Sequence, residues 1–367
     1  MRSYAAAFLF SACAMLSTAR AHGPNDPPHQ TFPEGVLQLE SGQAIRDFSI
    51  SYVTHGALNE TKSNAILVVT AIGGNHHRLD YLIGPGRALD PAKYFIIATD
   101  AIGNGLSTSP SNSKLQARMQ FPKFNIRDMV ASQYRLVTER FGIQRLVTVI
   151  GASMGGMQAL QWAVSYPEMM ASIVPIVPLG RTTAWTTGVL EMLRQTIMAD
   201  PNWNGGNYSA ANPPENGMRL WSGWLSGVIV RTPGYQETLF PKNTDVIAQL
   251  KNVRDAGWRR MDALDWIYQS WAYDAHDLGT TPGFGNDYQR ALHAIKARTL
   301  LLTGSGDLLN PEFDAREMAR AIPNVQLAEI NPGQAMGHYS GAGATAPENE
   351  RQNRLIAAFL NGQPIQQ

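Results

Sequence analysis

Residues 145–155 read Arg-Leu-Val-Thr-Val-Ile-Gly-Ala-Ser-Met-Gly, and this segment indicates the fold more clearly than any other. The apolar run at 145–150 predicts a buried strand, and the pattern at 154–165 predicts a helix directly after it. The turn between them fits Gly-x-Ser-x-Gly, whose glycines allow a sharp bend around a strained serine. Chance also produces this pattern in glycine-rich chains, but the flanking strand and helix favour a nucleophile. A structural turn serine is the alternative interpretation. We expect the Ser153 hydroxyl at the carboxyl end of a sheet, above the start of a helix.

Similar apolar runs alternate with helical patterns along both halves of the chain. Alternation of this kind predicts a mostly parallel, doubly wound sheet with helices on both faces, which is an α/β fold. Further strands are predicted at 48–53, 65–70, 94–99, 172–177, 298–303 and 325–330, and further helices at 126–141 and 348–360.

A different pattern occupies residues 181–290, between the two sheet-forming parts. No strand run of the earlier kind appears there, and Gly-Asn-Pro stretches break the segment, so we expect a mostly helical insertion. The two parts of the core are then residues 36–180 and 291–367. The tryptophans of the insertion either line an acyl pocket or form its own core, and seven of the eight in the chain lie here: Trp185, Trp203, Trp221, Trp224, Trp258, Trp266 and Trp271.

Composition excludes several classes of protein. With 44% hydrophobic residues in 367, the chain can bury a large core and is not mainly disordered. A formal charge of +1 argues against a nucleic-acid or anionic-membrane binder. Cys13 is the only cysteine, which excludes a structural disulfide and a cysteine-ligated metal site. The sequence does not set the oligomeric state, and a homodimer stays an open alternative.

The N-terminus has the pattern of a signal peptide at residues 1–21. Arg2 precedes an apolar stretch at 4–16 that is too short to span a bilayer, and Ala19-Arg20-Ala21 offers a cleavage site after Ala21. We expect a periplasmic or secreted protein, with an extended lead-in at 22–35 and no membrane span after cleavage. The alternatives are an apolar disordered terminus and lipidation at Cys13, where Phe10 fits a lipidation signal poorly.

A serine nucleophile needs a base, and the base needs a carboxylate that fixes its tautomer. After a turn of this kind the chain order is nucleophile, acid, histidine. His338 is the only histidine downstream of all the strand signals, and Asp307 directly follows the strand at 298–303. Asp314 and Glu312 are rivals for the acid, but they lie beyond Pro311 on the next helix. A surface histidine and a turn aspartate are the alternative interpretations.

The oxyanion of an acyl-transfer reaction needs two backbone N–H donors. Met154 supplies one, and Ile72, in the loop 70–74 after an early strand, is the best candidate for the other; a glycine turn without a catalytic role is the alternative. His76 and His77 are expected to line the pocket, because no third metal ligand stands at suitable spacing. Dinucleotide, phosphate, zinc and calcium motifs are absent, so we expect no cofactor and no metal.

The sequence resembles the α/β-hydrolase superfamily, and within it the homoserine O-acetyltransferase-like branch. The resemblance runs from about residue 36 to 360 and implies a Ser153–Asp307–His338 triad, a helical lid over about 181–290, and a ping-pong mechanism through an acyl-serine. It rests on the blocks at 82–90, 125–130, 150–160, 197–201, 205–208 and 307–311.

Three departures from this family point away from homoserine. The family usually has His-Ala-Leu-Thr-Gly at the oxyanion loop, aspartate after the catalytic histidine, and an arginine in a Leu-Ala-Arg helix of the lid. This chain has Thr-Ala-Ile-Gly-Gly at 70–74, Tyr339, and Leu-Trp-Ser-Gly-Trp at 220–224. A neutral, aromatic pocket containing Trp221, Trp224 and Tyr339 would leave both charges of an amino acid unpaired, which is costly.

These observations predict an exported serine hydrolase that cleaves a small-molecule acyl ester. Outside the cytoplasm acetyl-CoA is scarce, whereas water is always available as the acceptor. An O-acyltransferase is the alternative within the same superfamily, and a catalytically silent binding protein is the alternative from another class.

Overall fold

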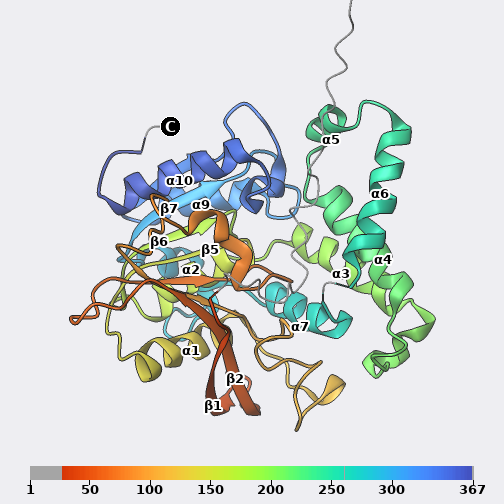
Figure 1. Ribbon diagram of the computed structural model, residues 1–367, viewed down its shortest axis with the longest axis horizontal. Coiled ribbons are helices and arrows are strands. Elements are labelled where there is room, and N and C mark those ends of the chain that lie inside the picture. Colours follow the sequence, from red (N-terminus) through yellow and green to blue (C-terminus); the bar gives the residue numbers. More distant parts are fainter. Residues whose placement is uncertain (1–26, 260, 366–367) are drawn as a thin grey trace, which may run out of the picture.

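An eight-stranded sheet runs through the computed structural model, which describes residues 27–259 and 261–365 (Figure 1). The predicted signal peptide, with Cys13 and the cleavage point after Ala21, lies outside the described residues. The strands are β1 (Gln30–Gln38), β2 (Ala44–His55), β3 (Ala65–Val69), β4 (Phe95–Thr99), β5 (Leu146–Ala152), β6 (Met170–Ile176), β7 (Arg298–Thr303) and β8 (Val325–Glu329).

The spatial order of the strands is β1-β2-β4-β3-β5-β6-β7-β8. From β4 to β8 every neighbouring pair is parallel, while β1 and β2 form an antiparallel hairpin that joins the sheet through β4. The predicted mostly parallel, doubly wound α/β sheet is therefore confirmed. Strands β3 and β4 are buried along their whole length, as continuous apolar runs in parallel sheets require.

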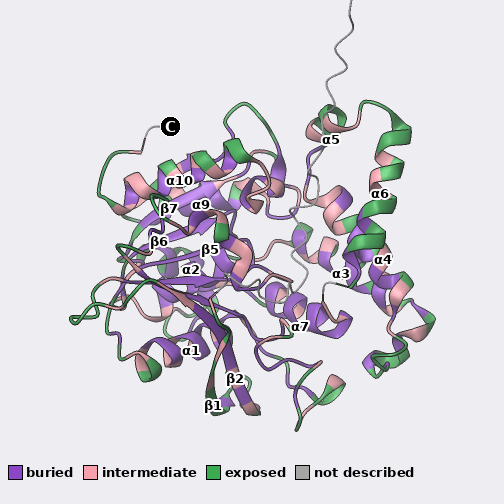
Figure 2. Cartoon of the chain, in the orientation of Figure 1, coloured by how far each residue is buried: buried purple, intermediate pink, exposed green. Residues whose placement is uncertain are grey.

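Helices cover both faces of the sheet. One buried apolar cluster joins the sheet to α1, α2 and α9, and a second joins its other face to α10 and the 3₁₀ helix η1. Figure 2 shows the central strands buried between these layers, whereas the edge strands β1 and β8 are partly exposed. The helices of the core are η1 (His76–Leu82), α1 (Ile126–Arg135), α2 (Met154–Ser165), α8 (Tyr288–His293), α9 (Glu312–Ala321) and α10 (Ala346–Leu360).

Local sequence explains where two of the predicted helices begin. Asn125 and Asp128 form a capping box at the start of α1, and Thr345 and Glu348 form another at the start of α10. The helix predicted at 126–141 is present, but its last turn is a π-helix at Leu136–Arg140. In the described residues no helix is both long and apolar enough to cross a bilayer.

The extended lead-in predicted at 22–35 overlaps a strand of the sheet. Residues from Gln30 onward belong to β1, which pairs with β2 at the edge of the sheet. Pro33 and the positive φ of Gly35, at 72°, interrupt the alternation that would have revealed a strand. Register shifts on both sides of Gly35 accommodate the irregularity, and proline is tolerated because β1 is an edge strand.

The chain between β6 and β7 is the insertion, and we call residues 181–290 the lid. Its described residues contain helices and turns but no strand, and its helices lie to the right of the sheet in Figure 1. Buried lid residues, Trp266 among them, belong to the same apolar cluster as α2, so lid and core share one interior. The main lid helices are α3 (Ala184–Met198), α4 (Glu215–Trp224), α5 (Pro233–Leu239), α6 (Asn243–Gly257) and α7 (Ala263–Asp274).

Candidate functional site

Ser153 stands at the sharp turn between β5 and α2. Its backbone has φ 58° and ψ −120°, a left-handed conformation that a non-glycine residue adopts only under constraint. The turn is closed by contacts that leave no room for side chains at its glycines. A Cβ on Gly151 would lie 2.5 Å from the carbonyl carbon of Gly155, and one on Gly155 would lie 2.5 Å from the Val69 oxygen. The predicted strand-turn-helix geometry is present.

The structure brings together the three residues expected to form the triad. His338 Nε2 lies 2.9 Å from Ser153 Oγ, and His338 Nδ1 lies 2.7 Å from Asp307 Oδ2. The backbone N–H groups of Leu309 and Asn310 both donate to Asp307 Oδ1 at 2.8 Å. With Asp307 fixed in this way, the Nδ1 hydrogen of His338 points to the carboxylate, and Nε2 is left to accept the serine proton.

The rivals for the acid lie elsewhere. Asp314 is buried on α9, where it accepts hydrogen bonds from the Gly180 backbone N–H and the Tyr288 hydroxyl. Glu312, at the start of the same helix, forms an ion pair with Arg316. Neither contacts His338, so Asp307 is the carboxylate that the geometry pairs with this histidine.

The two expected oxyanion donors belong to segments next to Ser153. Met154 opens α2, and Ile72 lies in the loop after β3 and lines the same pocket as Ser153. Within the described residues, neither backbone N–H has a protein acceptor. Gln269 of α7 holds the loop by accepting from the Gly73 N–H at 2.9 Å. Both N–H groups are thus available to an oxygen bound at Ser153.

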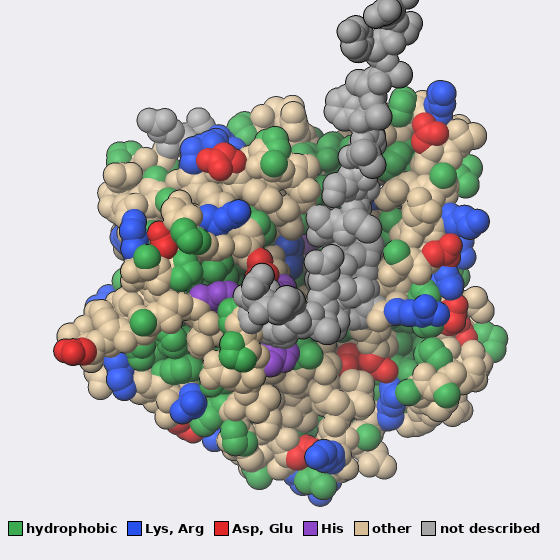
Figure 3. Space-filling view, in the orientation of Figure 1, with side chains coloured by type: hydrophobic (Ala, Val, Ile, Leu, Met, Phe, Trp, Pro, Cys, Tyr) green, Lys and Arg blue, Asp and Glu red, His purple; other side chains and the backbone are tan. Residues whose placement is uncertain are grey.

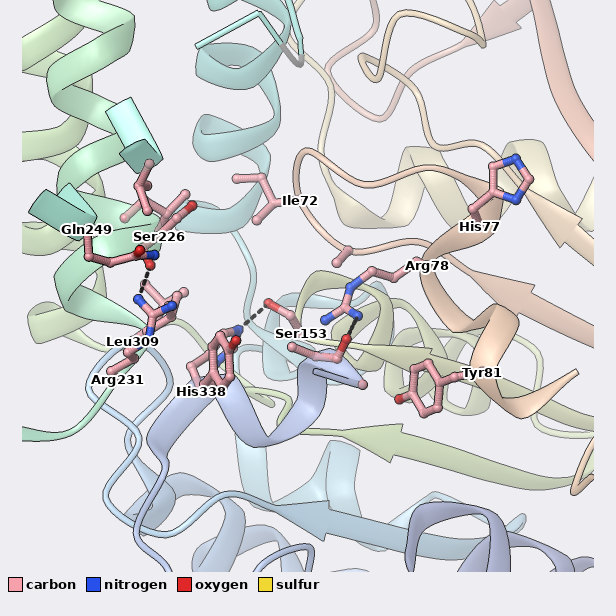
Figure 4. A pocket seen from close by; sticks show the side chains of 17 residues that line it. Ile72, His77, Arg78, Tyr81, Ser153, Ser226, Arg231, Gln249, Leu309 and His338 are labelled. Carbon is pink, nitrogen blue, oxygen red and sulfur yellow. Dashed lines mark hydrogen bonds between the residues drawn. The ribbon is translucent and has the colours of Figure 1, made fainter. Parts of the chain in front are cut away.

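The pocket above Ser153 has a volume of about 340 Å³ and lies between the core and the lid (Figure 4). Ile72, His77 and Tyr81 line it from the first part of the core, and His338 and Tyr339 from the second. The lid contributes Leu225, Ser226, Val230, Arg231, Gln249 and Val253.

The prediction of a neutral pocket is wrong, because Arg78 and Arg231 also line it. The guanidinium of Arg78 donates to the carbonyls of Gly341 and Ala342, both at 2.9 Å, and burial lowers its pKa. Arg231 lies over the ring of Tyr339 at 4.6 Å. The lining residues identified among the described part of the chain include no aspartate or glutamate. Among the described residues, the pocket has one cation from the core and one from the lid, and no acidic partner for a second charge.

Arg231 has unused hydrogen-bonding capacity. Its side chain is 8% exposed and donates through Nη1 to the Ser226 carbonyl. Its Nε is buried and has no hydrogen-bond partner among the described residues. The sequence alone could not assign it to the pocket, because it lies outside the 220–224 segment and reaches the site only through the fold of the lid.

The two tryptophans expected in the pocket lie elsewhere. Trp221 is 5% exposed and packs edge-on against Trp266, with ring centroids 5.3 Å apart, inside the lid. Trp224 is half-exposed and lines a separate apolar groove with Trp185 and Met192. Helix α4 packs against α3 and α6. Trp221 and Trp224 therefore contribute to the lid rather than to the Ser153 pocket.

The neighbouring histidines have different environments. His77 lines the pocket, as predicted, and its Nδ1 lies 2.7 Å from Asp80. His76 does not line the pocket. It is buried behind the oxyanion loop, where its Nδ1 lies 3.0 Å from Asp100 Oδ2. The prediction of a pocket-wall role for His76 is wrong, because consecutive residues of η1 point in different directions.

Tyr273 is a residue of the site that sequence analysis missed. It lies on α7, fully buried, and its hydroxyl donates to Asn310 Oδ1 at 2.6 Å. The hydroxyl also lies near the Ser153 side chain, and burial raises the pKa of Tyr273 well above its usual value. Tyr273 therefore stays neutral and connects the lid to the nucleophile. No local motif marks it.

Comparison with known proteins agrees with this geometry. Residues 64–342 match the family described as alpha/beta hydrolase fold. A homoserine O-acetyltransferase from Nostoc punctiforme is 35% identical over 309 residues, covering 80% of this chain and 86% of that protein. A probable esterase from Corynebacterium glutamicum is 34% identical over 321 residues, covering 85% and 89%. The solved structure of an acetyl esterase named MekB matches with a TM-score of 0.84 and 31% identity, covering 91% of this chain and 97% of that one.

Relatives of both kinds cover 80–91% of this chain, and the family match at 64–342 spans the strand-turn-helix that carries Ser153. The predicted resemblance is confirmed. The protein is a serine acyl hydrolase or acyltransferase, and the chain belongs to the α/β-hydrolase fold family, in the branch that holds homoserine O-acetyltransferases and acetyl esterases.

Proposed function

We propose that this protein is an exported ester hydrolase that works through an acyl-serine on Ser153, with His338 as base and Asp307 as its partner. The observation that carries the proposal is the hydrogen-bonded series Ser153–His338–Asp307 at the floor of a pocket lined by cations but by no described acidic side chain.

The mechanism follows from the positions of these groups. His338 Nε2 removes the proton of Ser153 Oγ as that oxygen attacks the ester carbonyl, and the N–H groups of Ile72 and Met154 stabilise the oxyanion. The protonated His338 then gives its proton to the leaving alcohol, which departs and leaves the acyl-serine. Water, deprotonated by the same nitrogen, then attacks the acyl-serine. As the bond between the acyl carbon and Ser153 Oγ breaks, His338 returns the proton to Oγ and the acid is released.

Hydrolysis is favoured over transfer to homoserine because of the charges in the pocket. Arg231 could pair with the carboxylate of homoserine. The ammonium group of homoserine, however, would meet no acidic side chain among the described lining residues. A desolvated charge without a partner costs several kcal/mol, which removes the advantage that a bound acceptor needs over water. An ester without an ammonium group, neutral or carrying a carboxylate, meets no such penalty.

The test compares two acceptors for one acyl-enzyme. Purified protein lacking residues 1–21 is given an activated acetyl ester with and without millimolar L-homoserine, and separately acetyl-CoA with L-homoserine. We expect ester hydrolysis whose rate homoserine does not change, and no O-acetylhomoserine by mass spectrometry. Formation of O-acetylhomoserine faster than acetate release from the ester would make the protein a transferase and overturn the proposal.

The proposal of export rests on the charged start, apolar stretch and cleavage pattern of residues 1–21. Protein recovered from its native host should begin at His22. Recovery of a functional form that still begins at Met1 would contradict export and would restore acetyl-CoA as an acyl donor.

A further inference from the structure

Three potential metal ligands meet behind the oxyanion loop, outside the pocket. His29 precedes β1, His76 lies in η1, and Asp100 directly follows β4, so the sequence gives no sign that they are neighbours. Their ligand atoms all lie within 4.8 Å of one another, and no other such group of three occurs in the described residues. His76 and Asp100 are buried, and the His29 side chain is 32% exposed. Figure 3 shows histidine side chains reaching the surface near the middle of the face drawn.

Hydrogen bonds do not account for all three short distances between the ligand atoms of His29, His76 and Asp100. His29 Nε2 lies 3.1 Å from His76 Nδ1, and the same Nδ1 lies 3.0 Å from Asp100 Oδ2. His76 Nδ1 carries at most one hydrogen, and that hydrogen cannot point at the carboxylate and at the His29 nitrogen together. The third distance between the ligand atoms, from His29 Nε2 to Asp100 Oδ2, is 3.6 Å. A cation between the three atoms would be attractive to every one of them.

The distances fit a tetrahedral metal centre. Zinc binds imidazole nitrogen and carboxylate oxygen at about 2.0–2.2 Å, so tetrahedral ligand atoms are separated by roughly 3.3–3.5 Å. The three edges observed here are 3.0, 3.1 and 3.6 Å. We propose that His29, His76 and Asp100 bind one divalent first-row transition metal ion, with Zn²⁺ as the best fit and water as the fourth ligand.

The surroundings of Asp100 support a metal ligand. Ser51 Oγ donates to its Oδ2 at 2.8 Å, and the His76 backbone N–H and Asn104 Nδ2 donate to its Oδ1 at 2.9 and 3.0 Å. Such bonds fix the orientation of a ligating carboxylate. Asp100 is fully buried, and within the described residues its ion-pair partners are His29 and His76 alone. A cation bound here would pair with this buried carboxylate.

The position of the site indicates a structural role. His76 stands four residues after Ile72, and Asn104, which donates to Asp100, also donates to the Gly74 carbonyl at 3.3 Å. The metal would tie the chain before β1 to the back of the oxyanion loop without entering the pocket. Three ligands from distant parts of the chain would add to folding stability, since the unfolded chain has no such site.

The experiment uses the full mature chain, stripped with a chelator and titrated with Zn²⁺ alone by calorimetry, then with Co²⁺ by visible absorption. His29 is the ligand to change, because it is the exposed member and its loss should spare folding. The matched control is His293→Ala, which removes an exposed histidine from α8 on another part of the molecule.

We expect one Zn²⁺ per wild-type and per His293→Ala chain, and at least tenfold weaker binding by His29→Ala. Zn²⁺ should raise the thermal midpoint of the first two proteins and have little effect on that of the third. Co²⁺ should give the intense visible bands of a four-coordinate site in the first two alone. The proposal is overturned by wild-type protein that binds neither ion at micromolar concentration, or by His29→Ala that binds Zn²⁺ as tightly as wild type.

Discussion

Ser153 combines a strained backbone with a hydroxyl whose proton already points at a base. The strain is maintained by tight glycine contacts around the turn, which do not involve the hydroxyl itself. The contacts that hold the Ser153 backbone in place are therefore separate from the hydroxyl that reacts.

This separation predicts that Ser153→Ala folds normally and is inactive. Ester turnover should fall by roughly 10⁴-fold or more, because no other group forms the acyl intermediate. Asp307→Asn should lose several orders of magnitude as well, since the amide favours the wrong tautomer of His338. Stopped assays with an activated ester and thermal unfolding measure both effects. A Ser153→Ala protein with wild-type turnover would rule out this nucleophile.

Arg231 predicts a preference among ester substrates. A carboxylate on the substrate can pair with its free Nε–H, whereas a neutral ester cannot. Arg231→Met should lower kcat/KM for a hemisuccinate ester by roughly 10–100-fold, the value of a charged hydrogen bond, and leave a butyrate ester of the same alcohol nearly unchanged. Arg316→Met, at an exposed position on α9, is the control. Equal losses for both esters would show that Arg231 acts only through packing against Tyr339.

The residues of the site divide clearly into those that sequence could identify and those it could not. Ser153, Asp307 and His338 follow strand ends in an order that the fold dictates, so chain order was sufficient. Arg78 reaches carbonyls 264 residues away along the chain, and Tyr273 reaches Ser153 from a lid helix. Such contacts depend on how distant parts of the chain pack together, which no local pattern encodes.

At the scale of elements, the parallel strands and part of β2 were predictable from the sequence, and the edge strand β1 was not. Strands β3 to β7 are apolar on both faces and leave continuous runs in the sequence. In strand β1, Pro33 and Gly35 interrupt the alternation of apolar and polar residues that indicates a strand. The same strand also buries a carboxyl group. That group is Glu34, whose side chain is fully buried.

Glu34 predicts a pH dependence of stability. Burial raises the pKa of its carboxyl to about 8, although Arg135 lies 3.2 Å away. The folded protein thus holds this proton more tightly than the unfolded chain, whose carboxyl has a pKa of 4.5. The resulting stabilisation is complete below that value and is lost as the pH rises through 8. Unfolding free energy should fall by roughly 2–4 kcal/mol from this group between pH 5 and pH 9.

Glu34→Gln should remove that part of the pH dependence, as measured by urea unfolding at several pH values. Glu60→Gln, at an exposed turn, should behave as wild type. If Glu34→Gln loses stability with pH as steeply as the wild-type protein, then Glu34 is ionised in the fold and the effect of Arg135 outweighs burial.

For the whole molecule, the lid and the core are expected to unfold together. One apolar cluster continues from the strands through α2 into the lid, where it includes Trp203, Trp221, Trp258 and Trp266. Tryptophan fluorescence reports mainly on the lid, which holds seven of the eight tryptophans, while far-ultraviolet circular dichroism reports on all helices and strands. The two transitions should coincide in denaturant. A fluorescence transition at clearly lower denaturant would show that the lid melts as a separate unit.

The lid lies in the chain between Ser153 and His338, which are 185 residues apart. A ribosome adding 5–20 residues per second needs about 10 to 40 s to cover that interval. During this time the nucleophile has been synthesised and its base has not, so an emerging chain carries an ordinary, unreactive serine. The growing chain is therefore catalytically inactive until its synthesis has reached His338.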